Sequence, residues 1–82
     1  MINVALYPNP ANEKLFIQNL DKPAADRIVI SDLSGKTVYS IDRPTSGGDG
    51  VYELDINSLT PGMYLIEMHT AGEKAVSRFV KE

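Results

Sequence analysis

The chain has 82 residues, a net charge of −3 and no cysteine. This length fits a single domain, and a chain so small buries only about two-thirds of the surface that it exposes when unfolded. The absence of cysteine excludes disulfides and thiolate chemistry, and the acidic balance argues against nucleic acid as a partner. No apolar run approaches the roughly 20 residues of a membrane helix, and no signal peptide stands before the first strand-like segment.

Met1 has two interpretations. It is either a natural start or a start residue added to a domain taken from a longer protein. We favour the second, because Ile2-Asn3-Val4 has the pattern of a strand already in progress. Residues 1–82 are therefore expected to form one domain excised from a larger protein.

Short strand-like segments alternate with turn residues along the whole chain, and no segment shows a sustained helical period. In chain order the predicted strands are Asn3–Leu6, Lys14–Asn19, Asp26–Ser31, Lys36–Ile41, Val51–Ile56, Met63–Thr70 and Lys74–Lys81. Short strands with turns at about 8–12-residue spacing are typical of a β-sandwich. The predicted fold class is all-β, an Ig-like sandwich of about seven antiparallel strands.

Prolines and a glycine turn divide the first half of the chain. Pro8 and Pro10 end the first strand, since each lacks the N–H that a central strand needs, and this corner is interpreted first as structural. A turn is expected at Asp21-Lys22-Pro23, and a hairpin turn at Asp32–Gly35, where glycine suits a positive φ. The residues predicted to face the core are Leu15, Ile17, Ile28, Ile30 and Val38. In the fourth strand, Val38 is preferred to the alternative set Thr37, Tyr39 and Ile41.

The second half begins with a glycine-rich loop, Arg43–Gly50. Leu59 is expected to close one end of the sandwich, and Ala71-Gly72-Glu73 to form a tight hairpin. Glu67 and His69 are predicted to face solvent. The residues predicted to face the core are Tyr52, Leu54, Ile56, Tyr64, Ile66 and Met68.

Four short motifs follow one another along the chain. They are Tyr7-Pro8-Asn9-Pro10-Ala11 with the apolar segment 15–17, Asp32-Leu33-Ser34-Gly35-Lys36, Leu59-Thr60-Pro61-Gly62-Met63-Tyr64, and Arg78-Phe79-Val80-Lys81. With these motifs in this order, essentially the whole chain resembles the C-terminal sorting domain of cargo proteins of the type IX (Por) secretion system. Glu82, after the closing Lys81, is the only departure from the family pattern.

The resemblance implies a secretion signal that needs neither catalysis nor a cofactor. Such domains direct an N-terminal cargo through the periplasm and across the outer membrane, to the cell surface or the medium. The implied partners are this cargo domain, a translocon or shuttle protein, and a surface sortase-like protease that cleaves the domain off and joins the cargo to an anionic lipopolysaccharide. The residues expected to carry recognition are Tyr7, Pro8, Asn9, Pro10, Asp32, Gly35, Lys36, Gly62, Tyr64, Arg78, Phe79, Val80 and Lys81.

The closing segment Arg78–Lys81 has two interpretations that its residues leave about equal. Alternating charge protects a sheet edge from unwanted pairing. Alternatively, the unpaired backbone accepts a partner strand by β-augmentation, and Arg78 and Lys81 add charge steering. The resemblance favours the second. An open edge also accepts its own copy, so a homodimer by edge pairing or strand exchange is a further expectation.

The sequence gives little support for a phosphate-binding, metal-binding or catalytic site. Gly35-Lys36 lacks the several glycines and the following helix of a phosphate loop, and Asp42 with Asp49 offers too few oxygens for a calcium loop. His69 is the only histidine, which excludes a multi-histidine metal site within one chain. A solvated sheet face is the preferred interpretation of Glu53, Asp55 and Glu67.

The alternative function is a carbohydrate-binding or adhesive accessory module. Glycan binding usually needs a platform of exposed aromatic rings, and the chain has no Trp, four Tyr and two Phe. Since Tyr52 and Tyr64 are predicted to be buried, the platform would be small. A free-standing enzyme is least favoured, because no nucleophile–base set is present.

Overall fold

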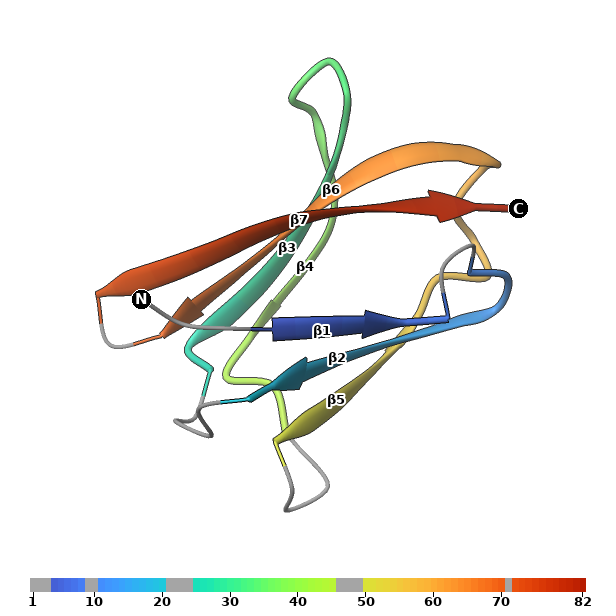
Figure 1. The fold of residues 1–82 in the computed structure, drawn as a ribbon. Coiled ribbons are helices and arrows are strands. Elements are labelled where there is room, and N and C mark those ends of the chain that lie inside the picture. The colour runs from blue at the N-terminus through green and yellow to red at the C-terminus, as the bar shows by residue number, and fades with distance from the viewer. Residues whose placement is uncertain (1–3, 9–10, 21–24, 46–49, 71) are drawn as a thin grey trace.

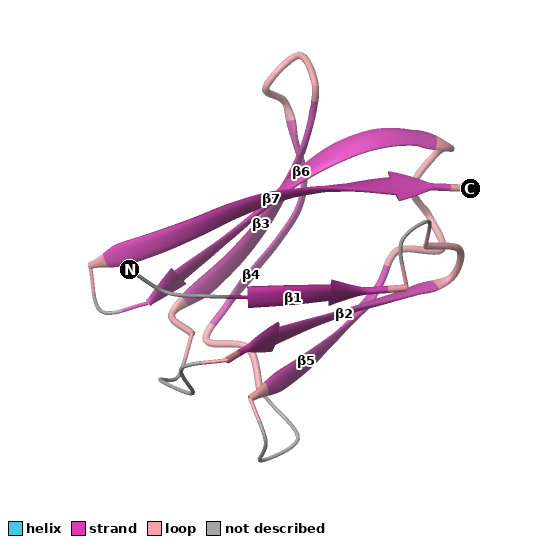
Figure 2. Cartoon of the chain, in the orientation of Figure 1, coloured by secondary structure: helices cyan, strands magenta, loops and turns pink. Residues whose placement is uncertain are grey.

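Two antiparallel sheets face each other in the computed structural model, which describes residues 4–8, 11–20, 25–45, 50–70 and 72–82 (Figure 1). Strands and loops make up all of these residues (Figure 2). The strands are β1 (Val4–Tyr7), β2 (Lys14–Asn19), β3 (Arg27–Asp32), β4 (Thr37–Asp42), β5 (Val51–Asp55), β6 (Gly62–Thr70) and β7 (Glu73–Lys81). The sheet orders are β1-β2-β5 and β4-β3-β6-β7. The predicted seven-stranded sandwich is confirmed, with β4 beside β3 rather than in the first sheet as in constant-type immunoglobulin domains.

The strand boundaries agree with the predicted ones to within one residue wherever both lie among the described residues. Lys14–Asn19 is identical, and the later strands differ by one residue at one or both ends. Six predicted features lie wholly or partly outside the described residues. They are the role of Met1, the start of the first strand at Asn3, Pro10 of the first corner, the turn Asp21-Lys22-Pro23, positions 46–49 of the glycine-rich loop, and Ala71 of the last hairpin.

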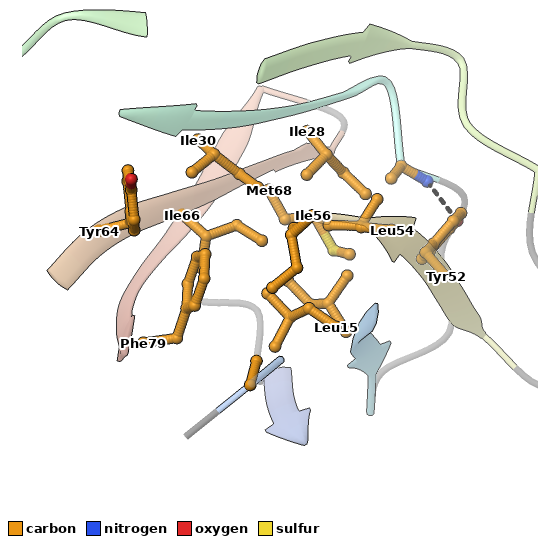
Figure 3. Close-up of a cluster of buried hydrophobic side chains, with 13 residues drawn as sticks. Leu15, Ile28, Ile30, Tyr52, Leu54, Ile56, Tyr64, Ile66, Met68 and Phe79 are labelled. Atoms are coloured by element: carbon orange, nitrogen blue, oxygen red, sulfur yellow. Dashed lines mark hydrogen bonds between the residues drawn. The ribbon is translucent and has the colours of Figure 1, made fainter. Parts of the chain in front are cut away.

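The core lies between the sheets and is built by alternation along each strand (Figure 3). The buried apolar residues are Ala11, Leu15, Ile17, Ala25, Ile28, Ile30, Tyr52, Leu54, Ile56, Tyr64, Ile66, Met68 and Phe79. The inward predictions for β2, β3, β5 and β6 are therefore confirmed, and Leu59 packs half-buried against the same cluster. The buried hydroxyl of Tyr52 accepts a hydrogen bond of 2.9 Å from the Ala25 N–H. Each large apolar side chain so buried contributes roughly 1.5–3 kcal/mol.

The prediction for β4 is wrong in part, because a register shift interrupts the alternation. Tyr39 and Ile41 pair with the buried Ile30 and Ile28, so they lie on the core face. The register shifts between Ile30 and Ser31. Val38 also packs against the core from this irregular position. A bulge places successive residues on the same side of a strand, and both sets therefore contribute.

Candidate functional site

The four sequence motifs come together at one end of the sandwich. The cross-strand pairs there are Tyr7 with Phe16, Asp32 with Tyr64, and Gly62 with Lys81. In Figure 1 this end holds the C-terminus, the end of β1 and the start of β6. We call it the motif end. Its described residues are Tyr7, Pro8, Ala11, Asp32–Lys36, Leu59–Tyr64 and Arg78–Glu82. Asn9 and Pro10 lie outside the described residues.

The first motif forms the corner where the chain leaves β1. The ring of Tyr7 stacks on Phe16 of β2, with centroids 5.5 Å apart and planes at 16°. The Tyr7–Pro8 peptide bond is cis, and Ala11 lies beside the other sheet. The expected structural corner is thus confirmed for its described residues. It places Ala11 beside β7 of the other sheet before the chain returns to its own sheet as β2.

A parallel bridge between Ala11 and Lys81 joins the first motif to the last. The Ala11 N–H donates to the Val80 carbonyl at 2.7 Å, and the Glu82 N–H donates to the Ala11 carbonyl at 2.8 Å. Ala11 is fully buried. We call this contact the terminal bridge. Nothing in the sequence pattern indicates that Ala11 pairs with the end of the last strand, although Ala11 lies in the first motif.

The second motif is a hairpin turn organised by one carboxylate. Asp32 Oδ1 accepts hydrogen bonds from the Ser34 N–H at 2.9 Å, the Ser34 hydroxyl at 2.6 Å and the Lys36 N–H at 3.0 Å. The Ser34 hydroxyl is the main cause that lowers the pKa of the Asp32 carboxyl from its ordinary value of 3.8. Gly35 has a φ of +92°, as predicted for the glycine of this turn. The Asp and Gly of the motif therefore fix the turn, and the Lys36 side chain is exposed.

The third motif turns the chain into β6 and packs against the core. Leu59 lies against the buried cluster, and the φ of +155° at Gly62 is one that other residues rarely adopt. The Tyr64 hydroxyl donates to the Thr60 carbonyl at 2.5 Å, and Thr60 Oγ1 lies 3.2 Å from the same hydroxyl. This return of a tyrosine to the backbone a few residues upstream resembles the tyrosine corner of immunoglobulin-like sandwiches.

The last motif has one residue in the core, one at the surface and a lysine turned inward. Phe79 is buried, whereas Arg78 is exposed. Lys81 is only 6% exposed, and its Nζ donates to the Glu82 carbonyl at 3.0 Å. Lys81 lies on the same face of β7 as Phe79 and is therefore mostly buried. Of the two cations expected to provide charge steering, Arg78 is the exposed one.

Shallow depressions line the motif end on the four-stranded sheet. One is bordered by Asp32, Leu33, Lys36, Val38 and the segment 60–64, and its neighbour by Met63 and the segment 77–80. Leu33 and Met63 are 64% and 42% exposed. Apolar side chains with nearby cations suit a protein partner. The described residues that border these two depressions include no histidine and no cysteine.

The remaining candidate groups are held in local pairs. Glu67 Oε1 lies 2.9 Å from His69 Nε2, so the half-buried histidine is paired rather than fully solvated. Lys14 Nζ lies 2.6 Å from Glu53 Oε2, and both residues belong to the three-stranded sheet. Glu67 belongs to the four-stranded sheet, so Glu53 and Glu67 do not form a cross-strand pair. No group of three metal-ligating side chains occurs in the part of the chain that the structure describes. Asp49 of the calcium hypothesis lies outside that part.

The aromatic rings provide little exposed area. Tyr52, Tyr64 and Phe79 are buried, which confirms the prediction for both tyrosines. Tyr7 is the exposed ring, at 42%, and it stacks on the half-buried Phe16. The glycan platform that the alternative function requires is thus one exposed ring. Among the described residues, no helix is long and apolar enough to cross a membrane.

Comparison with known proteins identifies the family. Residues 5–82 match the family described as the secretion system C-terminal sorting domain. The chain belongs to this family. A search of curated proteins found no match. The sorting domain is a C-terminal signal for type IX secretion, which implies an N-terminal cargo, interaction with the secretion machinery, and a surface or extracellular fate. Members of the family are in general non-catalytic.

Proposed function

We propose that the type IX machinery recognises this sorting domain at the motif end, through a translocon or shuttle protein. The observation that carries the proposal is that all four motifs, distant in sequence, lie at one end of the sandwich. That end is opposite the one at which the chain enters β1 (Figure 1). A cargo attached before β1 therefore leaves the motif end accessible.

The cargo route has four steps in this proposal. The cargo and the sorting domain cross the periplasm together, the motif end docks on the outer-membrane machinery, and a surface sortase-like protease removes the domain. The cargo is then joined to an anionic lipopolysaccharide or released. The family membership supports the export step, and the accessible motif end supports docking without contact to the cargo. The recognition residues proposed are six of the exposed members of the motifs, namely Tyr7, Pro8, Leu33, Lys36, Met63 and Arg78.

An export assay tests the proposal. Residues 2–82 are fused behind a signal peptide and a folded fluorescent reporter in a bacterium with a type IX system. We expect the reporter at the surface or in the medium, and we expect export to stop when the system is deleted. A reporter that stays in the periplasm although the domain is folded would contradict the sorting function.

Two substitutions at the motif end refine the assay. Lys36→Glu together with Met63→Ser changes exposed side chains beside one depression, and we expect reduced export with unchanged thermal stability. The matched control is Lys14→Gln with Glu53→Gln, an exposed ion pair on the other sheet. Such a pair contributes only about 0–1 kcal/mol. Equal export of both double variants would contradict recognition at the depression.

A further inference from the structure

The outer edge of β7 is only partly covered. β7 is the last strand of its sheet, with β6 on one side. On the other side, the Val80 carbonyl and the Glu82 N–H are taken by Ala11 in the terminal bridge. The edge is thus closed at its C-terminal end, in the very segment for which an open edge was expected.

The terminal bridge also fixes which backbone groups face outward. Along a strand, the N–H and C=O of one residue point to one side and those of the next to the other side. Because the outward groups at the bridge belong to Val80 and Glu82, the even-numbered residues of β7 face away from β6. The outward groups further along belong to Lys74, Val76 and Arg78. None of these three residues forms a backbone hydrogen bond to another described residue on that side. We call this segment, Lys74–Arg78, the open edge.

The side chains of the open edge form a fixed pattern. Lys74, Val76 and Arg78 alternate with residues directed toward the core, and all three are exposed, Val76 at 51%. Neither Lys74 nor Arg78 forms an ion pair among the described residues. The pattern along the outer face is therefore cation, apolar residue, cation.

We propose that the open edge accepts an extended segment of a partner protein in which two acidic residues flank an apolar one at alternate positions. The outward N–H and C=O groups pair with the backbone of that segment, as in β-augmentation. The two acids lie opposite Lys74 and Arg78, and the apolar residue lies opposite Val76. This inference rests on the proposed sorting function and specifies the chemistry of the strand that the machinery presents.

Charge also decides against a second copy of the chain as the occupant. If two open edges paired in antiparallel fashion about Val76, Lys74 of each would lie opposite Arg78 of the other. Like charges directly opposite each other destabilise a strand pair. Parallel pairing in register would again oppose cation to cation. An acidic strand removes this repulsion, so the homodimer expected from the sequence is the less favoured occupant.

Two end-blocked peptides test the pattern. The first is Glu-Thr-Val-Thr-Glu, whose sequence is the same in both strand directions, and the second is Lys-Thr-Val-Thr-Lys. Each is titrated into the ¹⁵N-labelled chain while the backbone amide signals of β7 are followed. We expect shifts at Lys74, Val76 and Arg78, and tighter binding of the acidic peptide by on the order of tenfold, since each opposite-charge pair contributes modestly. Equal affinities, or shifts confined to other residues, would overturn the proposal.

A charge swap supplies the matched control. In the variant Lys74→Glu with Arg78→Glu, we expect the preference to reverse, so that the basic peptide binds more tightly. The substitutions lie at exposed positions, and an unchanged melting temperature confirms that the fold is intact. A variant that still prefers the acidic peptide would show that the side chains at positions 74 and 78 do not determine which peptide binds.

Val76→Pro tests the backbone pairing. The Val76 N–H points away from β6, so proline removes an outward donor and leaves the β6–β7 ladder in place. Val76→Thr is the control that keeps the N–H. We expect proline to abolish peptide binding and threonine to retain it. If proline unfolds the domain, the charge swap decides alone. Light scattering that shows a dimer lost on Val76→Pro would instead identify a second copy as the occupant and overturn the acidic-strand proposal.

The export assay separates this inference from the function on which it rests. If the wild-type domain exports the reporter and Val76→Pro, though folded, exports it equally well, the open edge is not used and the sorting function stands. If the wild-type domain does not export the reporter, the sorting function fails, and the peptide titration alone supports or overturns the open edge as a strand-binding site.

Discussion

The rings of Tyr64 and Phe79 lie opposite each other on β6 and β7 and stack with centroids 5.6 Å apart and planes at 23°. Tyr64 belongs to the third motif and Phe79 to the fourth, and both are buried. Stacked aromatic pairs add about 0.5–1.5 kcal/mol beyond the area that they bury. This pair therefore holds the start of β6 and the end of β7 together. The buried pair thereby supports the backbone that carries the exposed residues of both motifs.

Tyr64→Phe is expected to destabilise the domain by about 1 kcal/mol, because it removes the hydrogen bond to the Thr60 carbonyl and keeps the ring stack. Urea denaturation measures the loss. Tyr39→Phe is the control, since the half-buried Tyr39 has no hydroxyl hydrogen bond among the described residues. Equal losses in the two variants would show that the Thr60 bond contributes nothing.

Removal of Val80–Glu82 is expected to speed amide exchange at Ala11. Both hydrogen bonds of the terminal bridge are lost, and each such bond contributes about 0.5–1.5 kcal/mol. Hydrogen–deuterium exchange followed by NMR gives the rate at the Ala11 N–H. The internal comparison is the Asn19 N–H, which donates to Gly50 at the other end of the sandwich. The bridge is refuted if Ala11 already exchanges rapidly in the intact chain.

Ser34→Ala is expected to raise the pKa of the Asp32 carboxyl toward 3.8, because the Ser34 hydroxyl is the main group that lowers it. A carboxyl with a lowered pKa in the folded state stabilises the fold above its unfolded pKa, and this contribution is lost as the pH falls through the folded pKa. The variant should therefore lose less stability than the wild type below pH 3.8. NMR titration of the carboxyl carbon measures the pKa, with the exposed Ser40→Ala as control.

Most of the fold could be predicted because apolar alternation is a local signal. The buried pairs Leu15 with Ile17 and Ile28 with Ile30 are spaced by two residues, as the sheet face requires. The prediction failed in part in β4, where it preferred Val38 to Tyr39 and Ile41. The register shift beside Ile30 interrupts the period, and all three side chains pack against the core. A register shift depends on the neighbouring strand, and nothing in the fourth segment itself indicates it.

Thr70→Val is expected to stabilise the domain by about 1 kcal/mol. The Thr70 hydroxyl is buried and forms no hydrogen bond with any described residue, and an unsatisfied buried polar group costs about 1–3 kcal/mol. Valine has nearly the same shape and no hydroxyl. The melting temperature provides the measurement, and Thr37→Val at an exposed position is the control. A lower melting temperature for Thr70→Val alone would indicate a hydrogen bond that the structure does not contain.

Gly50→Ala is expected to destabilise the domain more than Gly35→Ala. Both glycines have positive φ, +81° and +92°, which costs other residues about 1–2 kcal/mol. A Cβ at Gly50 would also lie 2.9 Å from the Asn19 carbonyl oxygen, whereas open space surrounds Gly35. Denaturant midpoints compare the two variants. Equal midpoints would mean that the backbone at Asn19 moves freely.

The candidate site was only partly predictable, because its main contacts involve the backbone. The motif residues could be named, but alternation does not say that their loops share one end of the sandwich. The bridge between Ala11 and Lys81 uses main-chain groups that every residue has. Lys81 was expected to add charge steering, whereas it lies on the same face of β7 as Phe79 and is mostly buried. Pairing between distant strands decided each of these points.

The shared direction of β1 and β7 has a mechanical consequence. The chain enters β1 at one end of the sandwich and leaves β7 at the other (Figure 1). The terminal bridge joins Ala11, which follows β1, to the end of β7 in parallel. A pull between a cargo on the N-terminal side and a carrier that holds the C-terminal end therefore acts along the strands. The hydrogen bonds of β1 and β7 then resist together in shear and do not open one after another. We therefore expect the domain to resist a pull between its two ends better than a pull that peels one strand from its sheet.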